Sequence, residues 1–309
     1  MANASAAQEA VIAAAEPLFS LSLDRPFGFN LDAGFAYAYQ LLFGQHPDQF
    51  RFVQGKTWLS TNMAVTATCL IYLAVIFGGQ ALMRNRAPIA FPILSKVHNL
   101  ILSVGSGVLL LLFIEQLLGP ILRKGPFWAV CADEAWTQRL ELLYYINYLF
   151  KYYELVDTVF LMLKKKPLEF LHYYHHSLTM ALCYTQLVGR TSVSWVPIVL
   201  NLGVHVVMYY YYFLASCGVR VWWKKYLTTM QITQFVLDLT VIYFCTYTYF
   251  AATYAPSLPN MGTCAGTETA ALWGALLLSS YLVLFIKFYR DTYIKQQRGR
   301  AAVKAKKSE

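Results

Sequence analysis

Seven long apolar runs alternate with short polar stretches along the chain, and most of them end at charged residues, proline or glycine. Each run is close to the roughly 20 residues that a helix needs to cross a bilayer. They cover residues 59–83, 96–118, 138–163, 168–188, 193–215, 226–251 and 270–289. The pattern predicts an all-α polytopic membrane protein with seven transmembrane helices. One membrane domain, residues 57–293, would lie between an amino-terminal segment, residues 1–56, and a basic tail, residues 294–309.

Proline and glycine set the predicted helix boundaries. Gly119 and Pro120 indicate the end of the second helix, because proline inside a helix removes a backbone hydrogen bond. Pro167, which follows three lysines, indicates a boundary between the third and fourth helices. The amino-terminal segment has no run long enough to span, so we expect short helices that lie on the membrane surface.

The composition agrees with a membrane protein and gives its orientation. Hydrophobic residues make up 58% of the chain and charged residues only 13%, about half the usual charged share. The net charge of +9 does not indicate nucleic-acid binding, because the basic residues lie in short loops and the tail instead of on one soluble face. Most of the 25 lysine and arginine residues fall on the side that carries the tail. The positive-inside rule therefore predicts a cytosolic carboxy terminus and, with seven spans, a luminal or extracellular amino terminus.

Three of the six histidines lie within five residues of the fourth helix, as His172, His175 and His176. Spacings of three and four residues place them on one face of a helix. Ionisable side chains are costly in hydrocarbon and often mark a functional site there. Core histidines that bond their neighbours are the competing interpretation.

Other polar residues lie in the same half of the membrane. They are Lys151, Glu154 and Asp157 in the third helix, Asn201, His205 and Tyr209 in the fifth, and Gln231 and Gln234 in the sixth. At about 1.5 Å of rise per residue, all lie nearer the cytosolic ends of their helices, whereas the luminal halves are mostly apolar. The pattern predicts a polar chamber that opens to the cytosol and continues as an apolar pocket, which suits an amphiphile with a charged head and an acyl chain. Hydrogen bonding between helices is the competing interpretation, above all for the glutamines.

Three classes of membrane protein could account for these polar residues. The His-x-x-His-His spacing occurs in membrane histidine-box metal oxygenases such as desaturases and hydroxylases, and imidazole ligates iron. A di-iron centre, however, draws its donors from several histidine boxes, and this chain has only one such box. Acyl transfer without a metal needs a histidine that a carboxylate or amide orients, and such partners are present. A non-enzymatic seven-helix lipid carrier gives no reason for clustered histidines.

Cysteine positions follow the predicted orientation. Cys131 and Cys264 fall in the two loops on the oxidising side of the membrane. We predict a disulfide between them, although sequence alone does not determine connectivity.

Four motifs occur in the order in which they occur in the ELO family of fatty-acid elongases, which the chain resembles. The motifs are Lys151-x-x-Glu154-x-x-Asp157-Thr158, His172-x-x-His175-His176, Asn201-x-x-x-His205-x-x-Met208-Tyr209 and Thr228-x-x-Gln231-x-x-Gln234-Phe235. The likeness runs from about residue 24 to residue 293, and neighbouring stretches look like the fungal branch. The resemblance implies a 3-ketoacyl-CoA synthase that condenses a long-chain acyl-CoA with malonyl-CoA. It also implies six helices around a tunnel closed at its luminal end, and no metal or other cofactor.

The resemblance further implies roles for single residues. His175 would be the nucleophile that takes the acyl group, and His205, with Asn201 beside it, would contact the reacting carbonyl and the malonyl unit. His172 and His176 would orient groups and exchange protons. The remaining motif residues would support them or line the substrate path: Glu154, Asp157, Lys151, Tyr209, Gln231 and Gln234.

Three further expectations concern the surroundings of the site. Arg220, Lys224 and Lys225 are candidates for binding the phosphates of CoA, with the positive-inside rule as the competing explanation. The last four residues, 306–309, resemble a dilysine signal for retrieval to the endoplasmic reticulum. Tyr247, Tyr249 and Phe250 are candidates for closing the tunnel and limiting chain length. The lipid bilayer, the reductases and dehydratase of the elongation cycle and a second copy of the chain are the expected partners.

Overall fold

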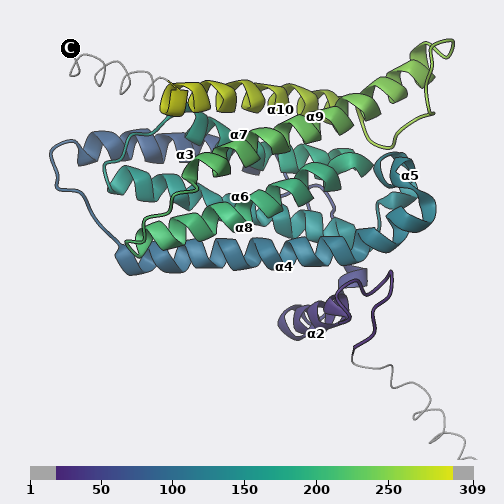
Figure 1. Cartoon of the computed structure of the whole chain (residues 1–309), viewed down its shortest axis with the longest axis horizontal. Helices are drawn as coiled ribbons and strands as arrows, with labels where there is room; N and C mark the ends of the chain where they lie inside the picture. Colours follow the sequence, from purple (N-terminus) through teal and green to yellow (C-terminus); the bar gives the residue numbers. More distant parts are fainter. Residues whose placement is uncertain (1–18, 295–309) are drawn as a thin grey trace, which may run out of the picture.

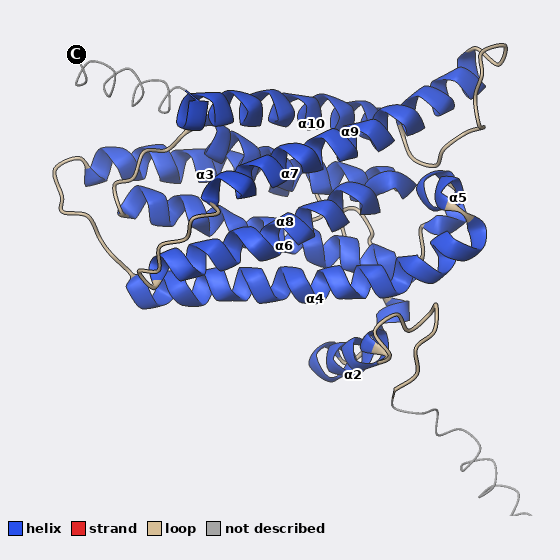
Figure 2. Cartoon of the chain, in the orientation of Figure 1, coloured by secondary structure: helices blue, strands red, loops and turns tan. Residues whose placement is uncertain are grey.

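The computed structural model describes residues 19–294, and its regular structure is helical (Figure 2). The only β-type pairing within these residues is a single bridge between Ser22 and Arg25. Seven of the described helices have at least 20 residues: α3 (Asn62–Met83), α4 (Pro92–Lys124), α6 (Gln138–Leu163), α7 (Phe170–Gly189), α8 (Trp195–Ser216), α9 (Lys224–Tyr254) and α10 (Glu268–Tyr289). Shorter α-helices are α2 (Leu31–Phe43) and α5 (Pro126–Cys131). The predicted all-α class is confirmed.

Six of the long helices form a closed ring. The order around the ring is α4, α8, α9, α10, α7 and α6, and α6 packs on α4 again. Helix α3 packs on α6 and α7 and lies outside the ring (Figure 1). A ring of six with one helix outside is the arrangement that the resemblance implied, whereas a closed luminal end remains a prediction.

The outer surface of the bundle is apolar enough for a membrane. Among the described residues, α3, α4, α8, α9 and α10 are long and apolar enough to span a bilayer. Large apolar side chains such as Leu70, Ile93 and Val104 are exposed on them, and lipid can cover such patches. Helices α6 and α7 have 26 and 20 residues but carry most of the polar residues identified above. A multi-pass membrane protein is confirmed, and a count of seven spans remains a prediction.

The connections with basic residues gather at one end of the bundle. The α3–α4 and α8–α9 loops lie at the end where α10 finishes, and α5 and the α9–α10 loop lie at the opposite end (Figure 1). Lys164 Nζ, just after α6, donates to Ser95 Oγ at 2.7 Å. Lys165 Nζ donates to the carbonyls of Arg84 and Arg86, at 3.1 Å each. These bonds tie the α6–α7 connection to the α3–α4 connection at what we call the basic end.

Helix α4 corrects one predicted boundary. It continues through Pro120 to Lys124, whereas Gly119 and Pro120 had indicated its end. The last turn is held by a tertiary contact, because the Arg123 guanidinium donates two hydrogen bonds to the Asp24 carboxylate, at 2.6 and 3.1 Å. Gly119 leaves room for this contact, since a Cβ there would lie 2.6 Å from Asp24 Oδ1. The one backbone hydrogen bond lost at Pro120 is not enough to end the helix.

The amino-terminal segment is docked on the opposite end. Helix α2 begins at Leu31, and the amides of Leu31 and Asp32 donate to the two carboxylate oxygens of Glu115, at 3.1 Å each. A carboxylate on the first amides of a helix satisfies donors that have no partner within the helix. The segment contains a short helix, as expected, and its position on the membrane surface remains a prediction. The predicted basic tail and retrieval signal lie mostly or wholly beyond residue 294, outside the described residues.

Candidate active site

Helix α6 places a buried ion pair at the centre of the ring. Lys151 and Glu154, three residues apart, are 3% and 2% exposed, and Lys151 Nζ lies 2.8 Å from Glu154 Oε1. Lys151 Nζ also donates to Asn201 Oδ1 of α8 at 2.9 Å. A buried charge is tolerated when it is paired and hydrogen-bonded. The structure thus brings together the two predicted residues of α6 and one of α8.

His205 of α8 shares the carboxylate of Glu154. It follows Asn201 by four residues, so the two side chains lie on the same face of α8. His205 Nδ1 lies 3.3 Å from Glu154 Oε1 but forms no hydrogen bond in this geometry. Its ring packs edge-on against Tyr209, with ring centres 5.2 Å apart. Glu154 is therefore placed between a lysine and an imidazole that can still change its hydrogen-bond partner.

Asp157 joins three helices one turn nearer the basic end. Its Oδ1 shares a hydrogen bond of 2.7 Å with His98 Nε2 of α4. Tyr209 of α8 donates its hydroxyl to Oδ2, also at 2.7 Å. The site residues of α6 and α8 are thus connected to α4 through His98, which is 2% exposed.

The histidine segment forms the first turns of α7. His172 and His176 lie against each other, with ring centres 4.4 Å apart. His172 Nε2 and His176 Nδ1 are buried and have no hydrogen-bond partner. His175 instead contacts Tyr281 of α10, with ring centres 4.9 Å apart. One imidazole of the segment is therefore directed toward α10, while the other two contact each other with their rings tilted by 44°.

A large pocket lies inside the ring, and His175 is at its polar end. The wall at that end includes Lys151, His175, Asn201 and Gln234. The wall then becomes mainly apolar, with Leu182, Ile198, Phe235, Ile242 and Leu278 among its residues. The far end is formed by Cys264–Thr267 in the α9–α10 loop, with Glu268 beside them. The empty space measures ≈ 1190 Å³, part of which is open to solvent. A polar end joined to an apolar length is the shape that the sequence predicted.

Other predicted residues lie behind this wall or at its edge. His172, His176, His205, Glu154, Asp157, Tyr209 and Gln231 do not line the pocket. Gln231 Nε2 donates to the sulfur of Met208 at 3.4 Å, and Gln234 Nε2 donates to Asp238 Oδ2 at 3.1 Å. The charged groups other than Lys151 therefore support the pocket wall from outside. Of the residues predicted for catalysis or substrate binding, four line the pocket: Lys151, His175, Asn201 and Gln234.

The three predicted basic residues lie at the α8–α9 connection, at the basic end. Arg220 and Lys224 are exposed, and Lys225 is partly buried. Lys225 Nζ lies 5.8 Å from the centre of the Tyr289 ring. The structure thus places these three cations at the basic end of the bundle, which is closer to the polar part of the pocket than the opposite end is.

Two residues of the site were not among the predicted site residues. His98 has no other site residue at helical spacing in α4. Asn147 lines the pocket one helical turn from Lys151, and its Oδ1 is buried without a hydrogen-bond partner. Its Nδ2 lies 3.7 Å from the sulfur of Cys183. A polar residue four positions from Lys151 is a signal that could have indicated Asn147.

The far end of the pocket contains the predicted cysteine pair and one predicted tyrosine. Cys131 and Cys264 form a disulfide across the far end. Tyr249 lines the pocket and donates to Glu268 Oε1 at 3.0 Å. Tyr247 is 50% exposed and donates to the carbonyl of Pro259, and neither Tyr247 nor Phe250 lines the pocket. Of the three residues considered for the tunnel end, Tyr249 alone reaches it.

Comparisons with known proteins agree with this geometry. Residues 57–301 match the sequence model of the ELO (GNS1/SUR4) family. “Putative fatty acid elongase 1” of Schizosaccharomyces pombe is 51% identical over 275 residues, which cover 89% of this chain and 82% of that protein. “Putative fatty acid elongase 2” of the same organism is 47% identical, over 85% of this chain and 72% of that protein.

A more distant animal protein matches along a similar length. “Long chain fatty acid elongase 1” of Caenorhabditis elegans is 31% identical, over 80% of this chain and 85% of that protein. The matched residues include all four motifs and the six helices of the ring. The chain therefore belongs to the ELO (GNS1/SUR4) family.

Proposed function

We propose that this protein is a 3-ketoacyl-CoA synthase, which condenses a long-chain acyl-CoA with malonyl-CoA in fatty-acid elongation. The family supports the elongation reaction, and its relatives are named as fatty acid elongases. The observation that carries the proposal is the position of His175. Its imidazole lies where the polar end of the pocket meets a long apolar wall, so a bound acyl chain would leave its thioester at this ring.

In the first half-reaction His175 is the nucleophile. An imidazole nitrogen attacks the thioester carbonyl, the carbon–sulfur bond breaks, and CoA leaves as a thiolate that takes up a proton. The acyl group is then held as an acyl-imidazole. The ring is partly buried and packs against Tyr281 and Phe285 beside the apolar wall, which limits access of the water that would hydrolyse this intermediate.

In the second half-reaction malonyl-CoA loses CO2. The electron pair of the broken carbon–carbon bond forms an enolate, which attacks the acyl carbon and releases the imidazole of His175. Loss of CO2 generates the carbanion without a strong external base. The released imidazole of His175 takes up one proton, and the products over the two steps are the 3-ketoacyl-CoA, CO2 and CoA.

The surrounding residues position and neutralise these groups. Asn201 and Lys151 line the pocket beside the reacting carbon, where a cation and an amide can stabilise developing negative charge. His205 is proposed to turn from Glu154 toward the malonyl carboxylate or carbonyl. His172 and His176 are proposed to exchange protons with His175, and Asp157 to hold Tyr209.

The remaining assignments follow from position and charge. Arg220, Lys224 and Lys225 at the basic end are proposed to bind CoA phosphates, and Gln231 and Gln234 to lie along the path from that end. The protein would lie in the endoplasmic-reticulum membrane with its carboxy terminus cytosolic. It would work with the reductases and dehydratase that process its product, as a homodimer and without a resident metal or cofactor.

The decisive experiment uses the purified full chain with acyl-CoA and labelled malonyl-CoA. We expect CO2 release and a labelled 3-ketoacyl-CoA, without iron in proportion to protein. His175→Ala should abolish both an enzyme-bound acyl group and condensation, whereas His46→Ala, at an exposed histidine, should leave both unchanged. An acyl group still bound to His175→Ala would remove His175 as nucleophile. Oxygen-dependent product together with stoichiometric iron would favour a histidine-box oxygenase.

A further inference from the structure

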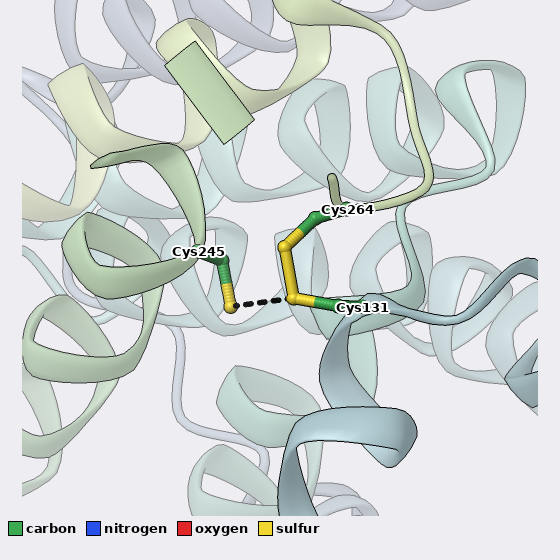
Figure 3. Close-up of side chains that lie close together, drawn as sticks. All are labelled: Cys131, Cys245 and Cys264. Carbon is green, nitrogen blue, oxygen red and sulfur yellow. Dashed lines mark hydrogen bonds between the residues drawn. A yellow bond between two sulfur atoms is a disulfide. The ribbon is translucent and has the colours of Figure 1, made fainter. Parts of the chain in front are cut away.

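Three sulfur atoms meet at the far end of the pocket. Cys131, the last residue of α5, is joined to Cys264 of the α9–α10 loop by the disulfide. Cys245 of α9 is a free cysteine, and its sulfur lies 3.8 Å from the sulfur of Cys131 (Figure 3). All three sulfurs lie within 4.8 Å of one another. We call Cys131, Cys245 and Cys264 the sulfur triad.

We propose that the sulfur triad is an internal site of thiol–disulfide exchange. The Cys245 thiolate attacks the sulfur of Cys131, a Cys131–Cys245 bond forms, and the Cys131–Cys264 bond breaks. Cys264 leaves as a thiolate and takes up a proton equivalent to the one that Cys245 lost. One disulfide is exchanged for another, so the step needs no external oxidant or reductant.

The position of Cys245 selects both its partner and the sulfur that it attacks. Cys245 is 5% exposed, and Val130 and Val196 are in the same buried apolar cluster. External thiols and oxidants therefore reach Cys245 poorly, while a disulfide sulfur lies beside it. The nearest sulfur is that of Cys131, which leaves Cys264 as the departing group. We expect exchange over minutes to hours, as for protein disulfides in general.

Exchange changes which element is covalently tied to α5. The tie runs to the α9–α10 loop in the described form and would run to α9 after exchange. The loop keeps other anchors, because the Ala265 amide donates to the Cys131 carbonyl at 2.8 Å and the Thr267 amide donates to the Gly189 carbonyl at 3.1 Å. Cys264 lines the pocket, so its freed thiol would face the pocket interior. This step is independent of the proposed acyl transfer and adds a reactive site to the opposite end of the same pocket.

The test traps the released thiol in the full chain. Purified protein in detergent is incubated with iodoacetamide at mildly alkaline pH without reductant, then acidified and digested with chymotrypsin. Cleavage after Tyr247 or Tyr249 separates Cys245 from Cys264 for mass spectrometry. We expect Cys131–Cys245 to accumulate together with alkylated Cys264. Alkylation of Cys264 should be at least about ten-fold slower in Cys245→Ala and unchanged in Cys217→Ala, at an exposed cysteine.

Either of two results in this experiment would overturn the proposal. One is alkylation of Cys245 while Cys131–Cys264 stays intact, and the other is equal alkylation of Cys264 with and without Cys245. A second variant tests the geometry separately. Cys264→Ala, which leaves Cys131 without its partner, should be isolated with a Cys131–Cys245 disulfide formed as the chain folds, and two free thiols in a variant that melts like the parent protein would contradict the proposed attack.

Discussion

At its polar end the pocket is backed by a network of charged and hydrogen-bonding groups, whereas its far end is bounded by a disulfide, Tyr249 and Glu268. At the polar end Lys151 donates to Glu154 and to Asn201 of α8, and Asp157 is bonded to side chains of α4 and α8. At the far end the disulfide joins α5 to the α9–α10 loop. Charged residues within a membrane are costly, so the buried ion pair at the polar end indicates where chemistry requires charge. At the far end a covalent bond and packing set the shape, and the Glu268 carboxylate accepts hydrogen bonds from Tyr249 and Tyr254.

The largest effect is expected when one partner of the buried ion pair is removed. Glu154→Leu leaves the Lys151 ammonium without its counter-charge, which should lower the free energy of unfolding by about 3–5 kcal/mol. Thermal melting of the purified protein in detergent would measure this loss. The double variant with Lys151→Met buries no charge there, so it should recover much of the stability. A double variant as unstable as Glu154→Leu would show that packing, and not the charge, explains the loss.

A smaller effect is expected at Asp157. Tyr209→Phe removes one of the two hydrogen bonds to the carboxylate, and bonds to charged groups contribute about 1.5–3 kcal/mol. Combination with His98→Phe should give a loss that differs from the sum of the single losses, because both donors serve one carboxylate. Tyr210→Phe is the matched control, since Tyr210 is 48% exposed on the same helix. Additive losses would contradict a shared network.

At the far end we expect a change in product and little change in activity. Tyr249→Ala removes a side chain from the pocket wall, so products should become longer by one or more elongation cycles if the pocket holds the acyl chain. Chromatography of the released fatty acids would measure the profile. Tyr247→Ala, at an exposed position that does not line the pocket, should leave it unchanged. Identical profiles for the two variants would mean that Tyr249 does not limit chain length.

The smallest effect is expected at an ion pair on the surface. Arg123→Gln breaks the contact with Asp24, but both side chains are largely exposed, so the melting temperature at neutral pH should not change measurably. The Arg123 guanidinium holds the pKa of Asp24 below its usual value. Any stabilisation of the folded state by this ion pair is therefore fully present at pH values above the ordinary carboxylate pKa. It is lost as the pH falls through the lowered pKa of Asp24. A marked loss at neutral pH would mean that this contact anchors the amino-terminal segment.

Local patterns predicted the parts of the molecule that depend on one helix at a time. Helix α6 begins at Gln138 and ends at Leu163, as its apolar run and flanking residues indicated. The pattern within α6 left either Glu154 or Asp157 as the partner of Lys151, and the structure pairs Lys151 with Glu154. The end of α4 was predicted too early, because a proline removes one backbone hydrogen bond and does not by itself end a long apolar helix.

The rest of the site depends on which helices are neighbours. His98 meets Asp157 only because α4 packs on α6, and Cys245 meets Cys131 only because α5 and α9 converge. Neither residue has a partner at helical spacing that would mark it. The motif residues gave the chemistry of the site, whereas packing decided that His175 faces the pocket and His205 does not.

The division between apolar helices and polar α6 and α7 has a consequence for biogenesis. Among the described long helices, those that are long and apolar enough to span a membrane are synthesised either before α6 and α7 or after them. Helices α3 and α4 come before, and α8, α9 and α10 come after. The charged residues of α6 make it a poor candidate for leaving the translocon into lipid by itself. Because α3 packs on both α6 and α7, the helix that lies outside the finished ring is already in the bilayer when they emerge. Helix α3 is therefore in a position to pack against α6 and α7 as they enter the bilayer. We expect α3 to contribute to assembly, whereas the six ring helices form the site.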